Sequence, residues 1–99
     1  MALERELVAK GHRVERQVRV TVYYHGEPLT WQTLDMVVDG KVIVEHKAGE
    51  RLPPDATAQL FSYLCSTNLE VGLMLHFGRR ARFYRLICEN RLKTRNPSF

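Results

Sequence analysis

The sequence predicts a single α/β domain built around a mixed sheet, and three patterns indicate it. Residues 14–24 alternate between apolar and polar side chains, which is typical of a strand with one apolar face. Residues 42–44 and 71–77 form apolar runs, as expected of buried strands. Residues 53–68, between these two runs, carry an apolar stripe at helical spacing. The length of 99 residues fits one domain of this kind.

The other segments complete the order α-β-β-β-α-β-β. A short helix is expected over residues 2–10, because Leu3 and Leu7 are spaced i, i+4 and Gly11 follows where a helix commonly ends. Further strands are expected over residues 31–38, 41–47 and 82–87. The Asp39-Gly40 pair predicts a tight hairpin between the second and third strands. We therefore expect a mixed central sheet flanked by helices.

Charge is distributed unevenly along the chain. Residues 1–78 contain 8 Lys or Arg and 10 Asp or Glu, a net charge of −2, whereas residues 79–99 contain 7 and 1, a net charge of +6. A basic segment of this kind favours a polyanionic partner, and a tail that only aids solubility is the alternative. The candidate nucleic-acid-binding residues are Arg79, Arg80, Arg82 and Arg85. We assign residues 1–90 to the domain and residues 91–99 to a basic C-terminal tail.

Several features predict a cytoplasmic protein. No apolar run approaches the roughly 20 residues that span a bilayer, so no membrane partner is expected. The N-terminal residues are charged where a signal peptide would be apolar. Cys65 and Cys88 would pair in a secreted protein, but in the cytoplasm we expect them to stay reduced and buried. The histidines show no spacing typical of zinc ligands: His12, His25, His46 and His76.

An acid on one predicted strand and an acid-x-lysine motif on the next are the candidate chemistry. Asp35 lies in the second strand, and Glu45-His46-Lys47 ends the third. Charged groups at the ends of apolar strands are costly to bury unless they are paired or bind a cation. Glu45 and Lys47 share one face of a strand, since they are two residues apart. Two carboxylates can hold Mg²⁺, and a lysine can assist a water that attacks a phosphate. The alternative is a salt-bridged strand end.

The register of the hairpin decides whether Asp35 can reach Glu45. A regular two-residue turn would place Asp35 opposite Val44, and its side chain would face away from Glu45. A three-residue loop with a bulge, and with Gly40 in the left-handed conformation, shifts the register by one and restores the shared face. We therefore predict a bulge or a strand bend between Asp35 and Glu45.

Six segments in order carry a family resemblance: Glu6-Leu7 with Gly11, VYYHG (22–26), LDMVV (34–38), VIVEHKA (42–48), AQLFSYL (58–64) and GLMLHFG (72–78). On these segments the chain resembles the GxxExxY protein family, a small group within the PD-(D/E)XK nuclease superfamily. The resemblance implies an α-β-β-β-α-β core. It maps the acid of the superfamily to Asp35 and its acid-x-lysine motif to Glu45 and Lys47. Gln59 matches a polar position often found near such sites, and an exposed helix residue is the alternative.

The sequence departs from the family pattern at two places. The motif that names the family would lie just before Ala2, so a carboxylate that helps to bind metal is missing, and neither Glu4 nor Glu6 matches that position. His46 stands where the family usually has an apolar residue. It is therefore either a partly buried imidazole with a hydrogen-bond partner or an exposed side chain at the sheet edge.

The resemblance implies a nuclease, or a nuclease-like phosphodiesterase, that depends on Mg²⁺ or Mn²⁺ and acts on nucleic acid. Asp35, Glu45, Lys47 and Gln59 would form the catalytic site, with Asp35 and Glu45 as the metal ligands. The alternative is a catalytically inactive module with the nuclease fold that binds nucleic acid or a protein partner. A homodimer is also expected if the shortened first helix leaves apolar sheet surface uncovered.

Overall fold

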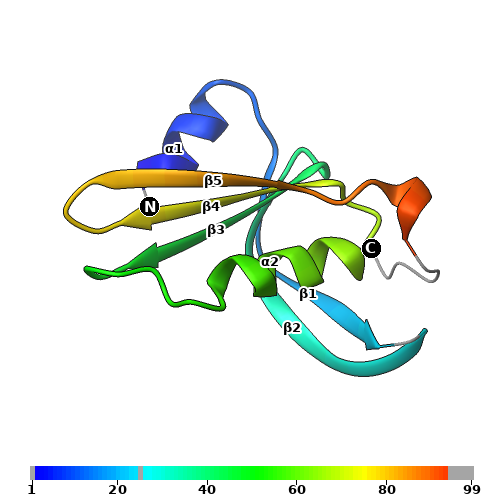
Figure 1. Ribbon diagram of the computed structural model, residues 1–99. Helices are drawn as coiled ribbons and strands as arrows, with labels where there is room; N and C mark the ends of the chain where they lie inside the picture. Colours follow the sequence, from blue (N-terminus) through cyan, green and yellow to red (C-terminus); the bar gives the residue numbers. More distant parts are fainter. Residues whose placement is uncertain (1, 25, 94–99) are drawn as a thin grey trace.

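The computed structural model describes residues 2–24 and 26–93, and the order of its elements confirms the prediction (Figure 1). The helices are α1 (Ala2–Ala9) and α2 (Ala56–Cys65), and a 3₁₀ turn, η1 (Asn90–Leu92), follows the last strand. The strands are β1 (Val14–Tyr24), β2 (Glu27–Val38), β3 (Val42–Ala48), β4 (Val71–Phe77) and β5 (Ala81–Ile87). No helix within the described ranges is long and apolar enough to cross a lipid bilayer.

The sheet is mixed, as the sequence predicts. Its strands lie in the order β1-β2-β3-β4-β5; the β3–β4 pair is parallel, and the other pairs are antiparallel. β3 and β4 can be parallel because α2 carries the chain back along the sheet between them. In Figure 1, α2 covers one face of the sheet and α1 lies on the other, so the two faces carry separate cores.

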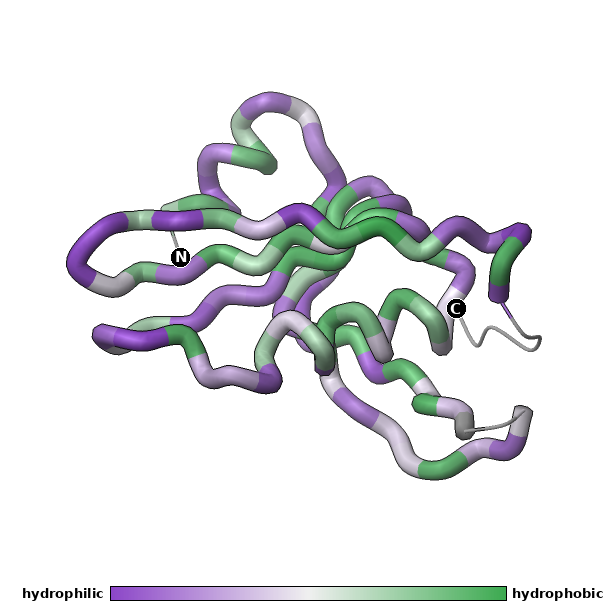
Figure 2. Tube along the Cα trace, viewed as in Figure 1, coloured by the Kyte–Doolittle hydropathy of each residue, from purple (hydrophilic) through white to green (hydrophobic). Residues whose placement is uncertain are grey.

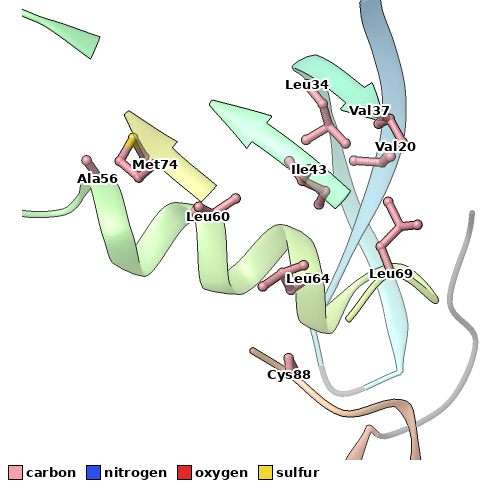
Figure 3. Close-up of a cluster of buried hydrophobic side chains, with 10 residues drawn as sticks. All are labelled: Val20, Leu34, Val37, Ile43, Ala56, Leu60, Leu64, Leu69, Met74 and Cys88. Carbon is pink, nitrogen blue, oxygen red and sulfur yellow. The ribbon is translucent and has the colours of Figure 1, made fainter. Parts of the chain in front are cut away.

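The larger core fills the space between α2 and the sheet. Figure 3 shows its buried side chains: Val20, Leu34, Val37, Ile43, Ala56, Leu60, Leu64, Leu69, Met74 and Cys88. Leu60 of α2 packs directly over Gly72 of β4, where an added Cβ would lie 3.1 Å from side-chain atoms of Leu60. The absence of a side chain at Gly72 therefore lets α2 sit close to the sheet.

A smaller core lies on the α1 face. It consists of buried side chains of β2 and β3, with two leucines of α1 packed against it: Met36, Val38 and Val44, then Leu3 and Leu7. The helix leaves part of this face open, because Phe77, Phe83 and Ile87 are 48%, 70% and 48% exposed. Large apolar side chains are thus uncovered on β4 and β5.

The two faces of the β1–β2 ribbon exchange sides in its middle, so side chains before and after this point belong to different cores. The alternation in the sequence does not reveal this change. Gln17 has a φ of 54°, in the left-handed region. Val14, before it, packs against the smaller core, whereas Val18 and Val20, after it, pack with the larger core. The expectation that these valines share one face is therefore wrong. Asp35 lies opposite Gln17 in the β1–β2 register, so the ribbon turns over beside the candidate site.

The β2–β3 turn has the register shift that the candidate site requires. Asp39 and Gly40 both have positive φ, 54° and 61°, as in a tight type I′ turn. The ladder nevertheless pairs Val38 with Val42, which leaves Lys41 as an extra residue outside it. The predicted bulge and the left-handed conformation of Gly40 are both confirmed.

The chain packs back onto the domain after β5. Lys93 Nζ donates hydrogen bonds to the backbone oxygens of Thr67 and Leu69, at 2.8 and 2.7 Å. These bonds tie the residues after η1 to the connection between α2 and β4. The rest of the predicted basic tail, residues 94–99, lies outside the described residues.

The two cysteines are free thiols that face each other. Cys65 ends α2, Cys88 follows β5, and their Sγ atoms are 3.0 Å apart. Burial and the hydrogen bond with Cys88 raise the pKa of Cys65 to about 12. Cys88 is buried and Cys65 is partly buried; their reduced state stays a prediction.

Candidate functional site

One cavity of about 310 Å³, here named the site cavity, is lined by all four residues predicted for the catalytic site: Asp35, Glu45, Lys47 and Gln59. It lies on the α2 face of the sheet, where β2 and β3 approach the start of α2. Core residues close its floor, and further polar side chains complete its rim: Ala56, Leu60 and Met74, then Gln32, Thr33 and Tyr63. The fold thus brings together residues from two strands and a helix.

Asp35 and Glu45 meet where β2 leaves β3. The last ladder pair on this side joins Met36 and Val44, so the next position places Asp35 opposite Glu45. Beyond this pair, the two carboxylates accept hydrogen bonds from backbone N–H groups of the neighbouring strand, in place of backbone-to-backbone bonds. The backbone N–H of Asp35 donates to Oε2 of Glu45 at 3.2 Å, and the backbone N–H of His46 donates to Oδ2 of Asp35 at 3.0 Å. Each carboxylate is therefore held by the strand that carries the other.

Glu45 is the buried member of the pair. Its exposed fraction is 7%, whereas the side chain of Asp35 is 30% exposed. Burial, then a side-chain hydrogen bond with Asp35 and the charge of Asp35, raise the pKa of Glu45 to about 8, whereas the hydrogen bond from the backbone N–H of Asp35 and the charge of Lys47 act in the opposite direction. A buried carboxyl beside a second carboxylate is stabilised by a proton or by a cation. The pair is thus electrostatically suited to bind a cation.

The acidic donor atoms of the site are the carboxylate oxygens of Asp35 and Glu45. No group of three His, Cys, Asp or Glu side chains within the described part of the chain could hold a metal ion. Mg²⁺ commonly takes one or two carboxylates and completes its shell with water and substrate phosphate. Asp35 and Glu45 supply such carboxylate oxygens. The residues present therefore fit Mg²⁺ or Mn²⁺.

Helix α2 presents Gln59 and Tyr63 to the site cavity, one turn apart. Gln59 is exposed, and its Nε2 donates to Oδ2 of Asp55 at 3.3 Å, so it is both an exposed helix residue and part of the cavity wall. Tyr63 is missing from the sequence prediction. Burial, then the charges of Glu45 and Asp35, raise the pKa of Tyr63. Its i+4 spacing from Gln59 is the signal in the sequence that indicates a shared helix face.

His46 is exposed and lies beside a candidate metal ligand. Its side chain is 42% exposed, and its Nδ1 is 3.2 Å from Oδ2 of Asp35. Neither alternative for His46 holds in full: the side chain is exposed, but β3 is the central strand of the sheet, and the imidazole has a partner in Asp35. Its contact with Asp35 depends on the hairpin register, and it could not be read from the spacing of the residues.

Three of the four arginines predicted to bind nucleic acid line a second cavity, of about 590 Å³, here named the arginine cavity: Arg79, Arg80 and Arg82. Arg51 from the β3–α2 loop joins them, although the sequence analysis did not select it. Arg85 is not part of this cavity. It pairs with Leu73, which packs against the smaller core, so Arg85 lies on the α1 face of the sheet.

A comparison of the sequence with protein-family models identifies the superfamily of this chain. A family model described as the PD-(D/E)XK nuclease superfamily matches residues 1–86. The chain belongs to this superfamily. Its α-β-β-β-α-β core runs from α1 to β4, as the resemblance implies. Membership of the GxxExxY group and the position of its naming motif relative to Ala2 stay predictions.

One solved structure is similar in fold to this chain. The crystal structure of SSO0001 matches with a TM-score of 0.59 and 16% sequence identity, over 89% of this chain and 47% of that chain. The present chain therefore spans about half the length of that protein. No curated protein matches the chain significantly.

Proposed function

We propose that the chain is a nuclease, or a nuclease-like phosphodiesterase, that hydrolyses nucleic acid with Mg²⁺ or Mn²⁺. The observation that carries the proposal is the pair of carboxylates that Asp35 and Glu45 present beside Lys47 in the site cavity. Superfamily membership supports a nuclease-like fold. The basic arginine cavity on the same face of the sheet supports a polyanionic substrate.

The residues of the site cavity have separate roles in this proposal. Asp35 and Glu45 would hold the cation, which when bound supplies positive charge to the substrate phosphate and acidifies water near it. Lys47 lies two residues after Glu45 on the same face, where its ammonium can orient the attacking water and stabilise charge that develops on the phosphate. Gln59 and Tyr63 would position substrate or water from the helix side.

The alternative proposal is a module that keeps the fold and binds nucleic acid or a protein partner without cleaving. The limited donor set of the site cavity favours it, because only two acidic side chains, Asp35 and Glu45, line this cavity. A homodimer is compatible with either proposal, and the exposed Phe83 on β5 supports a partner surface there.

Cleavage assays separate the two proposals. The chain is incubated with supercoiled plasmid, single-stranded DNA and single-stranded RNA, in Mg²⁺, in Mn²⁺ and with a chelator. The nuclease proposal expects cleavage of at least one substrate with metal and none with the chelator. Binding of the same nucleic acids without any cleavage would instead support the inactive module.

Substitution of Lys47 by alanine is expected to slow cleavage by about 100-fold, which is typical for the loss of one group that positions or transfers a proton. The binding of Mg²⁺ is expected to persist, since Asp35 and Glu45 are unchanged. Initial cleavage rates and metal affinity are measured on the same preparation. The matched control is Lys41→Ala, which removes an exposed lysine of the β2–β3 turn. Equal rates for the two variants would remove Lys47 from the mechanism.

A further inference from the structure

The arginine cavity is a second candidate site, with a basic lining, beside the site cavity. It lies between the β3–α2 loop, which supplies Arg51, and the β4–β5 hairpin, which supplies Arg79, Arg80 and Arg82. Figure 2 shows both segments as hydrophilic parts of the chain at the same end of the sheet. Leu52 and Tyr84, which pack against the larger core, form its apolar wall. The cavity is therefore a basic pocket whose apolar wall is packed against the core of the domain.

Acidic side chains of the described residues do not neutralise the positive charge of the arginine cavity. Glu50 lies 3.7 Å from Arg79, and both side chains are largely exposed. Across residues 2–24 and 26–93, no acidic side chain forms an ion pair with Arg51, Arg80 or Arg82. Several guanidinium groups around one cavity repel each other unless an anion lies between them. Arginine is also suited to phosphate, because its planar group donates two parallel hydrogen bonds.

The sheet ladder fixes the distance between the two cavities. Lys47 of the site cavity pairs with His76 of β4, and His76 pairs with Arg82 of β5. Paired residues on neighbouring strands point to the same face, so Lys47 and Arg82 are two strand spacings apart, about 10 Å. His76 is 6% exposed, and its Nε2 is 2.8 Å from the backbone oxygen of Gly49, which holds the β3–α2 loop in place.

We propose that the arginine cavity binds a backbone phosphate of the nucleic-acid strand next to the phosphate that is cleaved. Its volume of about 590 Å³ admits a nucleotide unit with its sugar. The substrate strand would then cross the sheet from the site cavity toward β5, past Tyr84 in the cavity wall. The assignment of the cleaved phosphate to the site cavity rests on the nuclease function proposed above.

Arg82 and Arg85 form a matched pair for the test, because they lie on the same strand but on opposite faces. Each is replaced by alanine, and Arg51→Ala tests the opposite wall of the cavity. The three arginines are exposed, so the variants are expected to fold. The probe is a fluorescein-labelled single-stranded DNA oligonucleotide, with an RNA of the same sequence in parallel. Fluorescence anisotropy gives the affinity at several salt concentrations with a chelator present, so that neither metal nor cleavage contributes.

Arg82→Ala and Arg51→Ala are each expected to bind the probe about fivefold more weakly near 0.1 M salt, as for the loss of one phosphate contact. The slope of log affinity against log salt is expected to become shallower by about 0.7 in each variant. Arg85→Ala is expected to retain the parent affinity and slope. Parent-like binding by Arg82→Ala, an equal loss in Arg85→Ala, or no binding by the parent chain would each overturn the inference.

The binding readout separates this inference from the nuclease proposal. A chain that binds through Arg82 and Arg51 but cleaves no substrate would contradict the nuclease proposal and leave the phosphate site standing. A chain that cleaves with metal, and whose binding does not depend on Arg82 or Arg51, would contradict the phosphate site alone.

Discussion

Asp35→Asn is expected to reduce metal-dependent cleavage by about 1,000-fold or more. The substitution removes one negative charge and one ligand from the proposed cation site, and a catalytic metal supplies several kcal/mol of transition-state stabilisation. The fold is expected to persist, because Asn keeps an oxygen that can accept the hydrogen bond from the backbone N–H of His46. Initial cleavage rates at saturating Mg²⁺ and Mn²⁺ measure the effect.

The matched control for Asp35→Asn is Glu27→Gln, which removes an exposed carboxylate of β2 that does not line the site cavity. It is expected to cleave at the parent rate. If Asp35→Asn also cleaves at the parent rate, Asp35 is not a metal ligand, and the proposed catalytic site is wrong.

Glu45→Gln is expected to remove a strong pH dependence of stability in the metal-free protein. The folded-state pKa of Glu45 is about 8 against an ordinary value of 4.5, so the folded chain keeps a proton that the unfolded chain has lost. The free energy of unfolding therefore falls as pH rises from about 4.5 to 8, by about 4 kcal/mol. That is a large part of the roughly 5–15 kcal/mol that stabilises a domain of this size.

Urea unfolding at about pH 5 and about pH 8, with a chelator present, measures this dependence. Glu45→Gln is expected to be the more stable protein at the higher pH, since a neutral amide carries no ionisation cost. The control Glu50→Gln, at an exposed position, is expected to keep the parent dependence. Saturating Mg²⁺ is expected to restore stability to the parent at the higher pH. A parent chain whose stability stays constant over this range would show that the pKa of Glu45 is not raised in the folded protein.

Much of the fold follows from local sequence patterns. The alternation in residues 14–24, the apolar run in residues 71–77 and the helical stripe between the central strands each correspond to an element of the structure. The sequence leaves two hairpin registers open for Asp35 and Glu45, and the structure has the one with an extra residue at Lys41, which the shared site requires. The two registers can be told apart because side-chain direction alternates along a regular strand, so a shift of one residue moves Asp35 to the other face.

Other features of the site depend on tertiary structure. The left-handed conformation at Gln17 has no local signal, since glutamine rarely adopts positive φ, and it reverses the faces of the β1–β2 ribbon. The contact of His46 with Asp35 forms at the place where β2 separates from β3, and that separation is a tertiary feature. A count of charges along the chain likewise cannot separate Arg82 from Arg85, because their difference lies in which face of β5 each occupies.

Calorimetric titration of the chain with Mg²⁺ and Mn²⁺ tests the central claim, that Asp35 and Glu45 form a divalent metal site. The account predicts one binding event in the parent chain, accompanied near neutral pH by release of a proton from Glu45. Binding is predicted to be lost in Asp35→Asn and in Glu45→Gln, with each variant still folded, and to be retained in Glu27→Gln. The absence of binding by the parent chain, or equal binding by all the variants, would contradict the claim.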